Sequence, residues 1–295
     1  KIELIPADLI DDSSLKESLR ISNPDEVYHL AAQSYVGTSF DQPITSGEFS
    51  GLAVARMLES VRQYNPKIKF YQASSSEMFG NVKSYPQNEM TTFSPQSPYA
   101  SAKVYGYHLT KIYREGYGMF ACNGILFNHE SPRRGETFVT KKITQAVARI
   151  YKGKQKVLKL GNMDAKRDWG HAKDFVYAQW LMLQQDKPQD YVIATGEAHT
   201  VREFVELAFK EVDIDIQWQG KGLDEKGINT EIGEVLIEVN ERYFRPAEVE
   251  LLLGDPSKAE KNLNWKRKIS FKDLVSGMVR YDFENEIFGG VESCT

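Results

Sequence analysis

The sequence predicts an α/β protein with a doubly wound parallel sheet and a second, smaller α/β domain. Three observations lead to this fold class. Apolar runs of strand length alternate with amphipathic stretches of ten or more residues up to about residue 130, which is the pattern of βαβ units. A Pro-Arg-Arg-Gly loop at 132–135 then ends the regular alternation. The chain has 295 residues, enough for two closely packed domains.

The elements of the first part follow from local patterns. Apolar runs predict strands at 2–6, 26–31, 67–73 and 119–127. The stretches between them predict helices at 13–22, 47–64 and about 98–117. The second of these has apolar residues at helical spacing, namely Leu52, Ala55, Met57, Leu58 and Val61. Right-handed crossovers between the parallel strands would give a Rossmann-like sheet.

The second part of the chain is less regular. We expect a helix at 137–151, a short strand near 156–160, a helix at 171–187 and a strand at 190–194, followed by short mixed elements. The helix and strand within 171–194 should return to the main sheet. The expected domains are residues 1–130 with about 171–195, and residues 131–170 with 196–295.

Composition excludes several classes of protein. Net charge is −4 with both signs interspersed, so no basic stripe predicts nucleic-acid binding. No apolar run reaches about 18 residues, so no membrane span is expected, and the first residues lack a signal-peptide pattern. Two cysteines, Cys122 and Cys294, are too few for a disulfide framework. They fit a reducing compartment, and we expect a cytoplasmic protein.

Four strand ends are expected to line one crevice, because ligands of open parallel sheets bind at the carboxyl ends of the strands. These ends fall at 7–9, 30–34, 73–77 and 127–130. The third has the sequence Ser-Ser-Ser-Glu at 74–77, where hydroxyls and a carboxylate follow an apolar strand. Taken alone, the three serines also fit a polar turn and Glu77 an ordinary surface carboxylate.

Tyr99 and Lys103 are four residues apart on a predicted helix and therefore share one face. A lysine ammonium beside a phenol favours the phenolate and brings the phenol pKa down toward the working pH. Tyr99 could then act as an acid or base. The alternative is a half-buried tyrosine with a solvated lysine neighbour.

Several longer motifs point to a family. They include HLAAQSYV, QASSSEMFG, SPYASAKVYGYH, NHESPRRGETFVTKKI, RDWGHAKDFV and RYFRPAEVELLLGDPSKA. The chain resembles extended short-chain dehydrogenase/reductases that act on nucleotide sugars, and within them the GDP-mannose 4,6-dehydratase family. The resemblance implies NADP as cofactor, GDP-mannose as substrate, and a homodimer or homotetramer. It also implies conversion to GDP-4-keto-6-deoxymannose by hydride transfer from C4 to C6 with loss of water.

The chain departs from the family pattern in three places. The Gly-rich phosphate loop after the first strand is absent from the sequence, so about 45 to 60 residues are expected before Lys1, the usual length of a βαβ unit plus a strand. Residues 44–46 are Ile-Thr-Ser where the family tends to have an aromatic residue. Ser75 stands where Thr is usual.

The resemblance assigns roles to individual residues. Ser75 would hydrogen-bond the hexose O4, Glu77 would remove the C5 proton, Tyr99 would exchange the O4 proton, and Lys103 would stabilise the phenolate and bind the nicotinamide ribose. Further cofactor-binding candidates are Asp8, Leu9, Leu30, Ala31, Ala32, Ser34, His129 and Arg134. The substrate-binding candidates are Asn128, Lys142, Arg167, Arg245 and Glu248.

Two other functions stay open on the sequence alone. A nucleotide-sugar epimerase or reductase on the same scaffold would share Tyr99, Lys103 and Arg245 but would not need Glu77. A non-catalytic dinucleotide-binding module would need no combination of Ser75, Tyr99 and Lys103. The variant Glu77→Gln separates the dehydratase from the epimerase or reductase.

Overall fold

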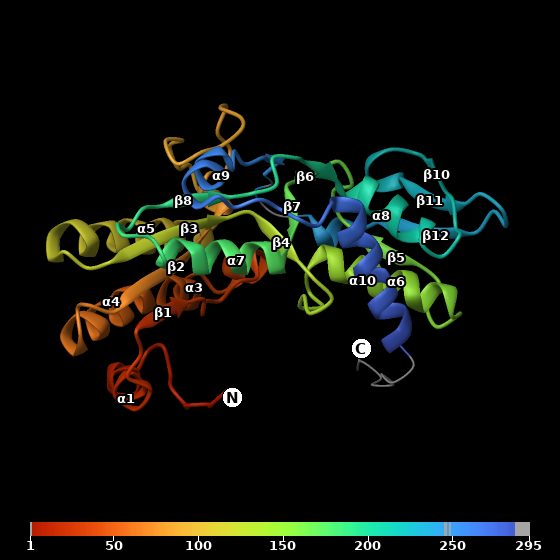
Figure 1. The fold of residues 1–295 in the computed structure, drawn as a ribbon. Coiled ribbons are helices and arrows are strands. Elements are labelled where there is room, and N and C mark those ends of the chain that lie inside the picture. Colours follow the sequence, from red (N-terminus) through yellow and green to blue (C-terminus); the bar gives the residue numbers. More distant parts are fainter. Residues whose placement is uncertain (1, 245–246, 248, 287–295) are drawn as a thin grey trace. The chain divides into compact units, whose positions relative to one another are not determined.

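The computed structural model describes residues 2–244, 247 and 249–286. The chain divides into two compact units, which are described separately (Figure 1). Unit 1 comprises residues 1–128, 173–197 and 252–266, and unit 2 comprises residues 129–172, 198–251 and 267–295.

Unit 1 contains a four-stranded parallel sheet in the order β1-β2-β3-β8. Its strands are β1 (Glu26–His29), β2 (Lys69–Ser75), β3 (Ala121–Leu126) and β8 (Tyr191–Ile193). The register sets His29 beside Gln72 and Ser75 beside Leu126, so the carboxyl ends of the strands lie at one edge. The α/β fold with a parallel sheet predicted from the sequence is confirmed.

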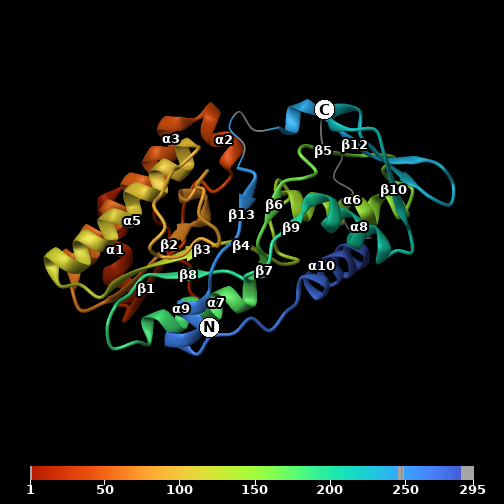
Figure 2. The same cartoon turned by 90° about the horizontal axis from the view of Figure 1, so that it is seen from above.

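Helices cover both faces of this sheet. On one face, α1 (Asp12–Ser22), α4 (Ala53–Tyr64) and α5 (Pro98–Tyr117) bury apolar side chains against Phe70 and Ala121. The neighbouring side chain, Lys69, points the other way, and its Nζ donates to Leu183 O at the end of α7 (Ala172–Leu183) at 2.6 Å. Figure 2 shows α5 and α7 on opposite sides of the sheet.

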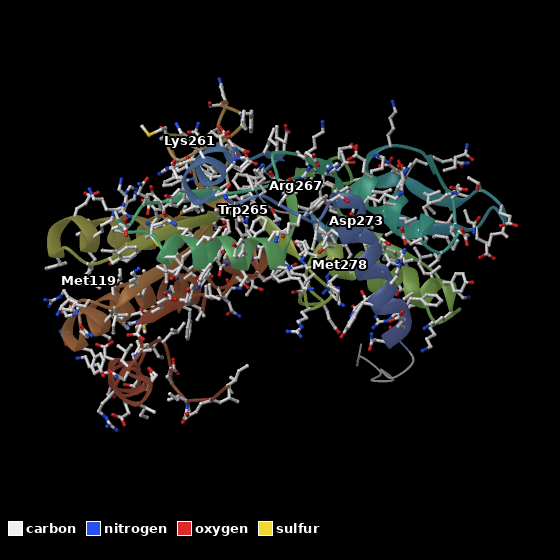
Figure 3. The ribbon with its side chains drawn as sticks, viewed as in Figure 1. Met119, Lys261, Trp265, Arg267, Asp273 and Met278 are labelled. Atoms are coloured by element: carbon white, nitrogen blue, oxygen red, sulfur yellow. The ribbon has the colours of Figure 1, made fainter. Side chains whose placement is uncertain are left out.

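Residues 252–266 were expected in the second domain but belong to unit 1. Two hydrogen bonds explain the difference. Lys258 Nζ, on α9 (Ser257–Leu263), donates to Asp190 O at 2.7 Å, and Trp265 Nε1 donates to Asp174 O at 2.8 Å. Trp265, labelled in Figure 3, is fully buried, so this segment completes the packing of unit 1.

Two sequence-based expectations for unit 1 were wrong. Residues 2–6 form no strand, and Ile2 and Leu4 are 88% and 90% exposed. A strand is stabilised by pairing with a neighbour, and β1 pairs on one side only among the described strands. The expected helix at 47–64 is interrupted by a π-helical turn at Glu48–Leu52. Two short helices that the sequence did not suggest precede it, α2 (Val36–Asp41) and α3 (Pro43–Gly47).

Unit 2 pairs a mixed sheet with three helices. The sheet order is β10-β11-β12-β5, with an antiparallel run followed by a parallel pair. Its strands are β10 (Ile216–Gln219), β11 (Lys226–Asn229), β12 (Val235–Val239) and β5 (Leu158–Leu160). The helices are α6 (Val139–Tyr151), α8 (Val201–Lys210) and α10 (Phe271–Asn285).

The core of unit 2 is rich in aromatic residues. Trp169 packs edge-to-face on Phe204 and stacks on Phe271, with ring centroids 5.4 and 6.0 Å away. Met278, labelled on α10 in Figure 3, is fully buried in the same cluster. Trp169 lies in the RDWGHAKD motif but has a packing role here.

Short elements complete the described chain. The strands are β4 (Asn128–Glu130), β6 (Lys166–Arg167), β7 (Trp169–His171), β9 (His199–Thr200) and β13 (Leu251–Leu252), and the 3-10 turns are Ser76–Met78, Gly222–Asp224 and Glu241–Tyr243. Among the described helices, none combines the length and apolar character needed to cross a membrane.

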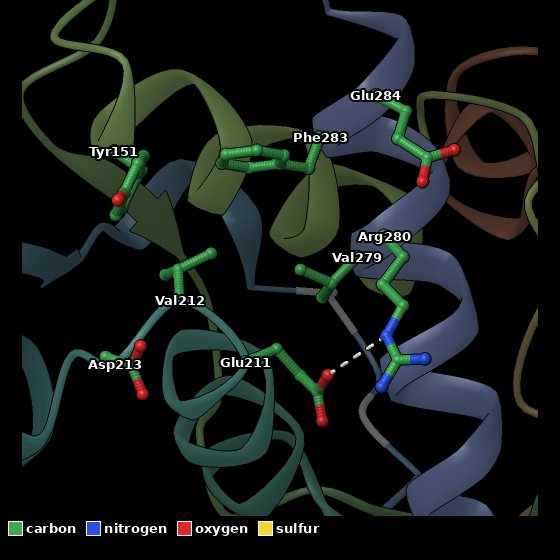
Figure 4. A pocket seen from close by; sticks show the side chains of 8 residues that line it. All are labelled: Tyr151, Glu211, Val212, Asp213, Val279, Arg280, Phe283 and Glu284. Carbon is green, nitrogen blue, oxygen red and sulfur yellow. Dashed lines mark ion pairs between the residues drawn. The ribbon is translucent and has the colours of Figure 1, made fainter.

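A cavity of about 200 Å³ lies among α6, α8 and α10 of unit 2 (Figure 4). An ion pair between Glu211 and Arg280, 3.7 Å long, crosses its wall. Its lining contains none of the predicted site residues; the lining residues are Tyr151, Glu211, Val212, Asp213, Val279, Arg280, Phe283 and Glu284.

Candidate active site

Lys103 is held at the carboxyl end of β2. It lies one turn into α5 and is only 4% exposed. Its Nζ donates to Ala73 O at 2.8 Å, two residues before the end of the strand. Burial lowers the pKa of Lys103 to about 8, because an apolar environment disfavours the charged form. The ammonium is therefore fixed by the strand backbone and can titrate close to neutral pH.

Tyr99 lies one turn before Lys103 on the same face of α5. Lys103 Nζ is 5.7 Å from the centroid of the Tyr99 ring. The helix begins sharply, because Ser97 accepts a hydrogen bond from Ala100 N at 3.1 Å and Pro98 occupies the first turn. This start fixes Tyr99, which is 8% exposed, in the first turn. The expected shared face of Tyr99 and Lys103 is thus observed.

The three serines at 74–76 differ in burial and in hydrogen-bond partners. Ser74 is buried, and its Oγ donates to Asn123 Oδ1 at 3.1 Å across the sheet. Ser75 ends β2 and caps the 3-10 turn that follows, where its Oγ accepts from Glu77 N at 3.2 Å. Ser75 and Glu77 are both half-buried, whereas Ser76 is buried. Ser75 and Glu77 therefore remain as the accessible hydroxyl and carboxylate of this turn.

The turn after β2 is fixed by close packing at Gly80. This glycine has φ of 56°, and a Cβ there would lie 1.8 Å from Ser94 O. Only glycine adopts this conformation and this approach without strain. Phe79, fully buried beside it, stacks in a tilted arrangement near Phe93 and Phe127. The position of Glu77 is thus set by a rigid segment.

The cofactor-binding candidates at the end of β1 are accessible. The pairing of His29 with Gln72 brings Leu30 next to Ala73, the residue that holds Lys103. The segment after Leu30 is anchored by Gln33, whose backbone O accepts from Ser50 Oγ at 3.1 Å. Leu30, Ala31 and Ser34 are exposed, and Ala32 is half-buried.

Asp8 and Leu9 precede α1 in unit 1. Asp8 is exposed, and its Oδ1 accepts from Ile10 N at 3.1 Å, so it shapes a turn. The cap of α1 is Asp11, which accepts from Ser13 N at 3.0 Å. Leu9 packs against the core shared by α1 and α4.

Three candidates follow β3 in the sequence, where unit 1 ends and unit 2 begins. Asn128 is half-buried and ends unit 1. His129 and Arg134 belong to unit 2, and both are half-buried. Arg134 Nε lies 3.0 Å from Glu130 Oε2, and its guanidinium lies 3.5 Å from the centroid of the Phe138 ring.

The remaining substrate candidates lie in unit 2. Lys142, on α6, has its Nζ 3.2 Å from the centroid of the Tyr243 ring, and burial lowers its pKa. Arg167 is buried in β6, and its Nη1 donates to Lys166 O at 3.0 Å. Arg245 and Glu248 lie outside the described residues.

Sequence reasoning missed four residues that support these candidates. Glu130 and Phe138 contact Arg134, and each is four positions from it, a spacing that could have been noticed. Tyr243 contacts Lys142, which is 101 positions away in the sequence. Asp190 pairs with Arg114, 76 positions away on the helix that carries Tyr99 and Lys103. Such long-range contacts leave no local pattern in a single sequence.

Comparison with known proteins identifies close relatives. The sequence model of the family described as GDP-mannose 4,6 dehydratase matches residues 1–278. The chain is 54% identical to a GDP-mannose 4,6 dehydratase of Dictyostelium discoideum, covering 94% of this chain and 78% of that protein. It is 52% identical to a GDP-mannose 4,6 dehydratase of Drosophila melanogaster, covering 96% and 72%.

Among solved structures, RMD from Pseudomonas aeruginosa in complex with NADPH has a similar fold. The TM-score is 0.82 over 96% of this chain and 90% of that one, at 23% sequence identity. At this identity the similarity concerns the fold.

Proposed function

The chain belongs to the GDP-mannose 4,6-dehydratase family, and we propose that it converts GDP-mannose to GDP-4-keto-6-deoxymannose with NADP as cofactor. One observation carries the chemical part of the proposal. The end of β2 presents Ser75 and Glu77, and the same strand end fixes Lys103 beside Tyr99. A dehydratase needs an acid–base pair for oxidation and a second base for water loss, and this arrangement offers both.

The residues present fit the nicotinamide and ribose part of NADP. Lys103 uses one N–H group on Ala73 O, which leaves donors for ribose hydroxyls. Leu30, Ala31 and Ser34 offer an accessible strand end beside it. When bound, NADP supplies hydride chemistry, taking up a hydride from C4 of the hexose and returning it to C6.

In the proposed mechanism each side chain has a separate task. Ser75 hydrogen-bonds O4, and Tyr99 as phenolate accepts the O4 proton while Lys103 stabilises the phenolate charge. The C4 ketone acidifies the C5 proton, which Glu77 removes. Glu77 then protonates the departing C6 hydroxyl, which leaves as water. C5 takes up a proton from solvent, and Tyr99 releases the O4 proton to solvent. The overall change is loss of one water with no external reductant.

We extend the proposal to the domains and the remaining candidates. Unit 1 would bind NADP together with His129 and Arg134, and unit 2 would bind the nucleotide sugar. The half-buried Lys142 and the buried Arg167 support the second part, because desolvated cations bind phosphates strongly. Asn128, Arg245 and Glu248 would complete that site.

The proposal also includes a homodimer or homotetramer in the cytoplasm. Exposed Tyr105 and Ile112 on α5 support self-association, because large apolar side chains often lie in subunit interfaces. The buried free thiol of Cys122 is compatible with a reducing compartment. Light scattering after size-exclusion chromatography measures the assembly directly.

A single experiment tests the function. The purified protein is incubated in D₂O with GDP-mannose and NADP, and the product is analysed by mass spectrometry. We expect the product to have lost one water and to have gained one deuterium at C5. Recovery of unchanged GDP-mannose from a folded protein that binds NADPH would refute the proposed reaction.

The variant Glu77→Gln tests the assignment of the second base. Amide nitrogen cannot remove the C5 proton, so we expect water loss to fall by at least about 100-fold, the scale of general-base catalysis. Oxidation at C4 should persist and can be followed by nicotinamide absorbance. Glu115→Gln, an exposed carboxylate on α5, is the matched control. Water loss at the original rate in Glu77→Gln would assign the base elsewhere.

A further inference from the structure

Glu130 is a buried carboxylate for which the proposed reaction has no task. It ends β4, is 2% exposed, and accepts a hydrogen bond from Thr140 Oγ1 at 2.7 Å. Thr140 lies in the first turn of α6, where the helix dipole favours a nearby negative charge. The second partner is Arg134, with Nε 3.0 Å from Glu130 Oε2. The three side chains form one chain of polar contacts.

The guanidinium of Arg134 is held from two directions. Glu130 lies at its Nε, and the ring centroid of Phe138, the residue just before α6, lies 3.5 Å from the guanidinium carbon. A carboxylate at one edge and an aromatic ring over one face restrict the rotation of the side chain. Among the described residues, the contact of Arg134 with Glu130 is an ion pair without a hydrogen bond at Nε, so the guanidinium keeps N–H groups for a ligand.

The burial of Glu130 makes its contact with Arg134 costly to lose. Burial raises the pKa of Glu130, although Arg134 and Thr140 act in the opposite direction. An ionised carboxylate in this place costs desolvation free energy, which the contacts with Arg134 and Thr140 offset.

We propose that Glu130 and Phe138 form a clamp that orients Arg134 for binding the anionic part of NADP. Glu130 and Phe138 are positioning residues, because they act through Arg134. This inference rests on the proposed function, which assigns Arg134 to the cofactor. The clamp supplies a guanidinium whose orientation is fixed before binding, and this lowers the entropic cost of forming hydrogen bonds to an anion.

The test is NADPH binding to Glu130→Gln and Phe138→Leu, measured by fluorescence titration. Glutamine keeps the size of the side chain and can still accept from Thr140, but it removes the charge. We expect Kd for NADPH to rise about tenfold in Glu130→Gln and about fivefold in Phe138→Leu, within the range of charge-assisted and cation–π contacts. Glu136→Gln is the matched control, an exposed carboxylate in the same loop that pairs with Gln145.

Two further measurements separate positioning from stability. Circular dichroism should show Glu130→Gln and Phe138→Leu folded at the temperature of the titration, so that a raised Kd reports lost positioning and not unfolding. In an Arg134→Gln background, Glu130→Gln should change Kd by less than about twofold, because the clamp then has nothing to orient.

The outcomes are distinct. Unchanged Kd in Glu130→Gln and in Phe138→Leu would overturn the clamp, and so would an equal loss with and without Arg134. If Glu130→Gln does not fold, the Kd of Phe138→Leu for NADPH alone tests the clamp. If the original protein binds NADPH but does not dehydrate GDP-mannose, the proposed function fails while the clamp can still be measured.

Discussion

At the scale of a single residue, the burial of Lys103 opposes the positive charge that the proposed mechanism requires of it. In the proposed mechanism the ammonium must be charged to stabilise the Tyr99 phenolate, yet burial lowers its pKa to about 8. Water is replaced around it by the helix and the end of β2, and Ala73 O offers one neutral acceptor. A lysine in such a place is charged at neutral pH and loses its proton in mildly alkaline solution.

This pKa leads to a prediction for the pH dependence of catalysis. As pH rises through about 8, Lys103 becomes neutral, so kcat/KM should fall by about tenfold for each pH unit above that value. In Lys103→Arg the guanidinium stays charged, and the alkaline limb should move upward even if the overall rate is lower. An unchanged limb in Lys103→Arg would assign the titration to another group.

At the same scale, a serine at position 75 meets the requirement of the proposed role, although the resemblance leads us to expect threonine there. The hydroxyl that matters is the Oγ, which already accepts from Glu77 N and caps the turn. A threonine would add one methyl group and a stiffer side chain. The hydrogen-bonding capacity is the same in both residues.

At the scale of elements, α5 is attached to the sheet at both ends. Near its start Lys103 bonds to β2, and near its end Arg114 forms a bidentate ion pair with Asp190, at 2.8 and 2.9 Å. Asp190 Oδ1 also accepts from Asn123 N on β3 at 2.8 Å. The helix that carries Tyr99 is therefore fixed along its length relative to the strand ends.

The ion pair of α5 gives a prediction for stability. Asp190→Ala would leave Arg114 with an uncompensated, largely buried charge, so the free energy of unfolding should fall by about 3–5 kcal/mol. The double variant Arg114→Met, Asp190→Leu should recover much of this loss. Urea denaturation monitored by circular dichroism measures both.

An exposed pair provides the control for this comparison. Arg20 and Glu17 on α1 are also close, but their side chains are 67% and 51% exposed. Glu17→Ala should change stability little, because solvent screens such pairs. Equal losses from Glu17→Ala and Asp190→Ala would show that burial does not govern the strength of the α5 attachment.

At the scale of the whole molecule, the sequence predicted most of the regular elements and fewer of the irregular ones. Helix α5 and strands β2 and β3 were expected within two residues of their observed bounds, because their apolar periodicity is strong. The expected strand at 2–6 failed, since periodicity does not reveal whether a partner is present. The π-helical turn at Glu48–Leu52 was missed because it retains a helical pattern of apolar residues.

In the candidate site, too, some features were predictable from the sequence and others were not. The spacing of Tyr99 and Lys103 predicted their shared face, and the strand-end rule predicted where the serine cluster lies, whereas the choice of Ser75 and Glu77 within it depended on the family resemblance. Unit 1 brings these side chains to one strand end. The contacts that fix Arg134 and Lys142 depend on tertiary packing. They could not be predicted, because one sequence contains no information on which distant residues approach each other.

The bond between Lys103 and Ala73 has a consequence for how this site tolerates mutation. The acceptor is a backbone carbonyl, and every amino acid carries one. Substitution at position 73 cannot remove it, so variation there is limited only by the space around the side chain. The requirement falls on position 103 alone, where the ammonium must reach the strand.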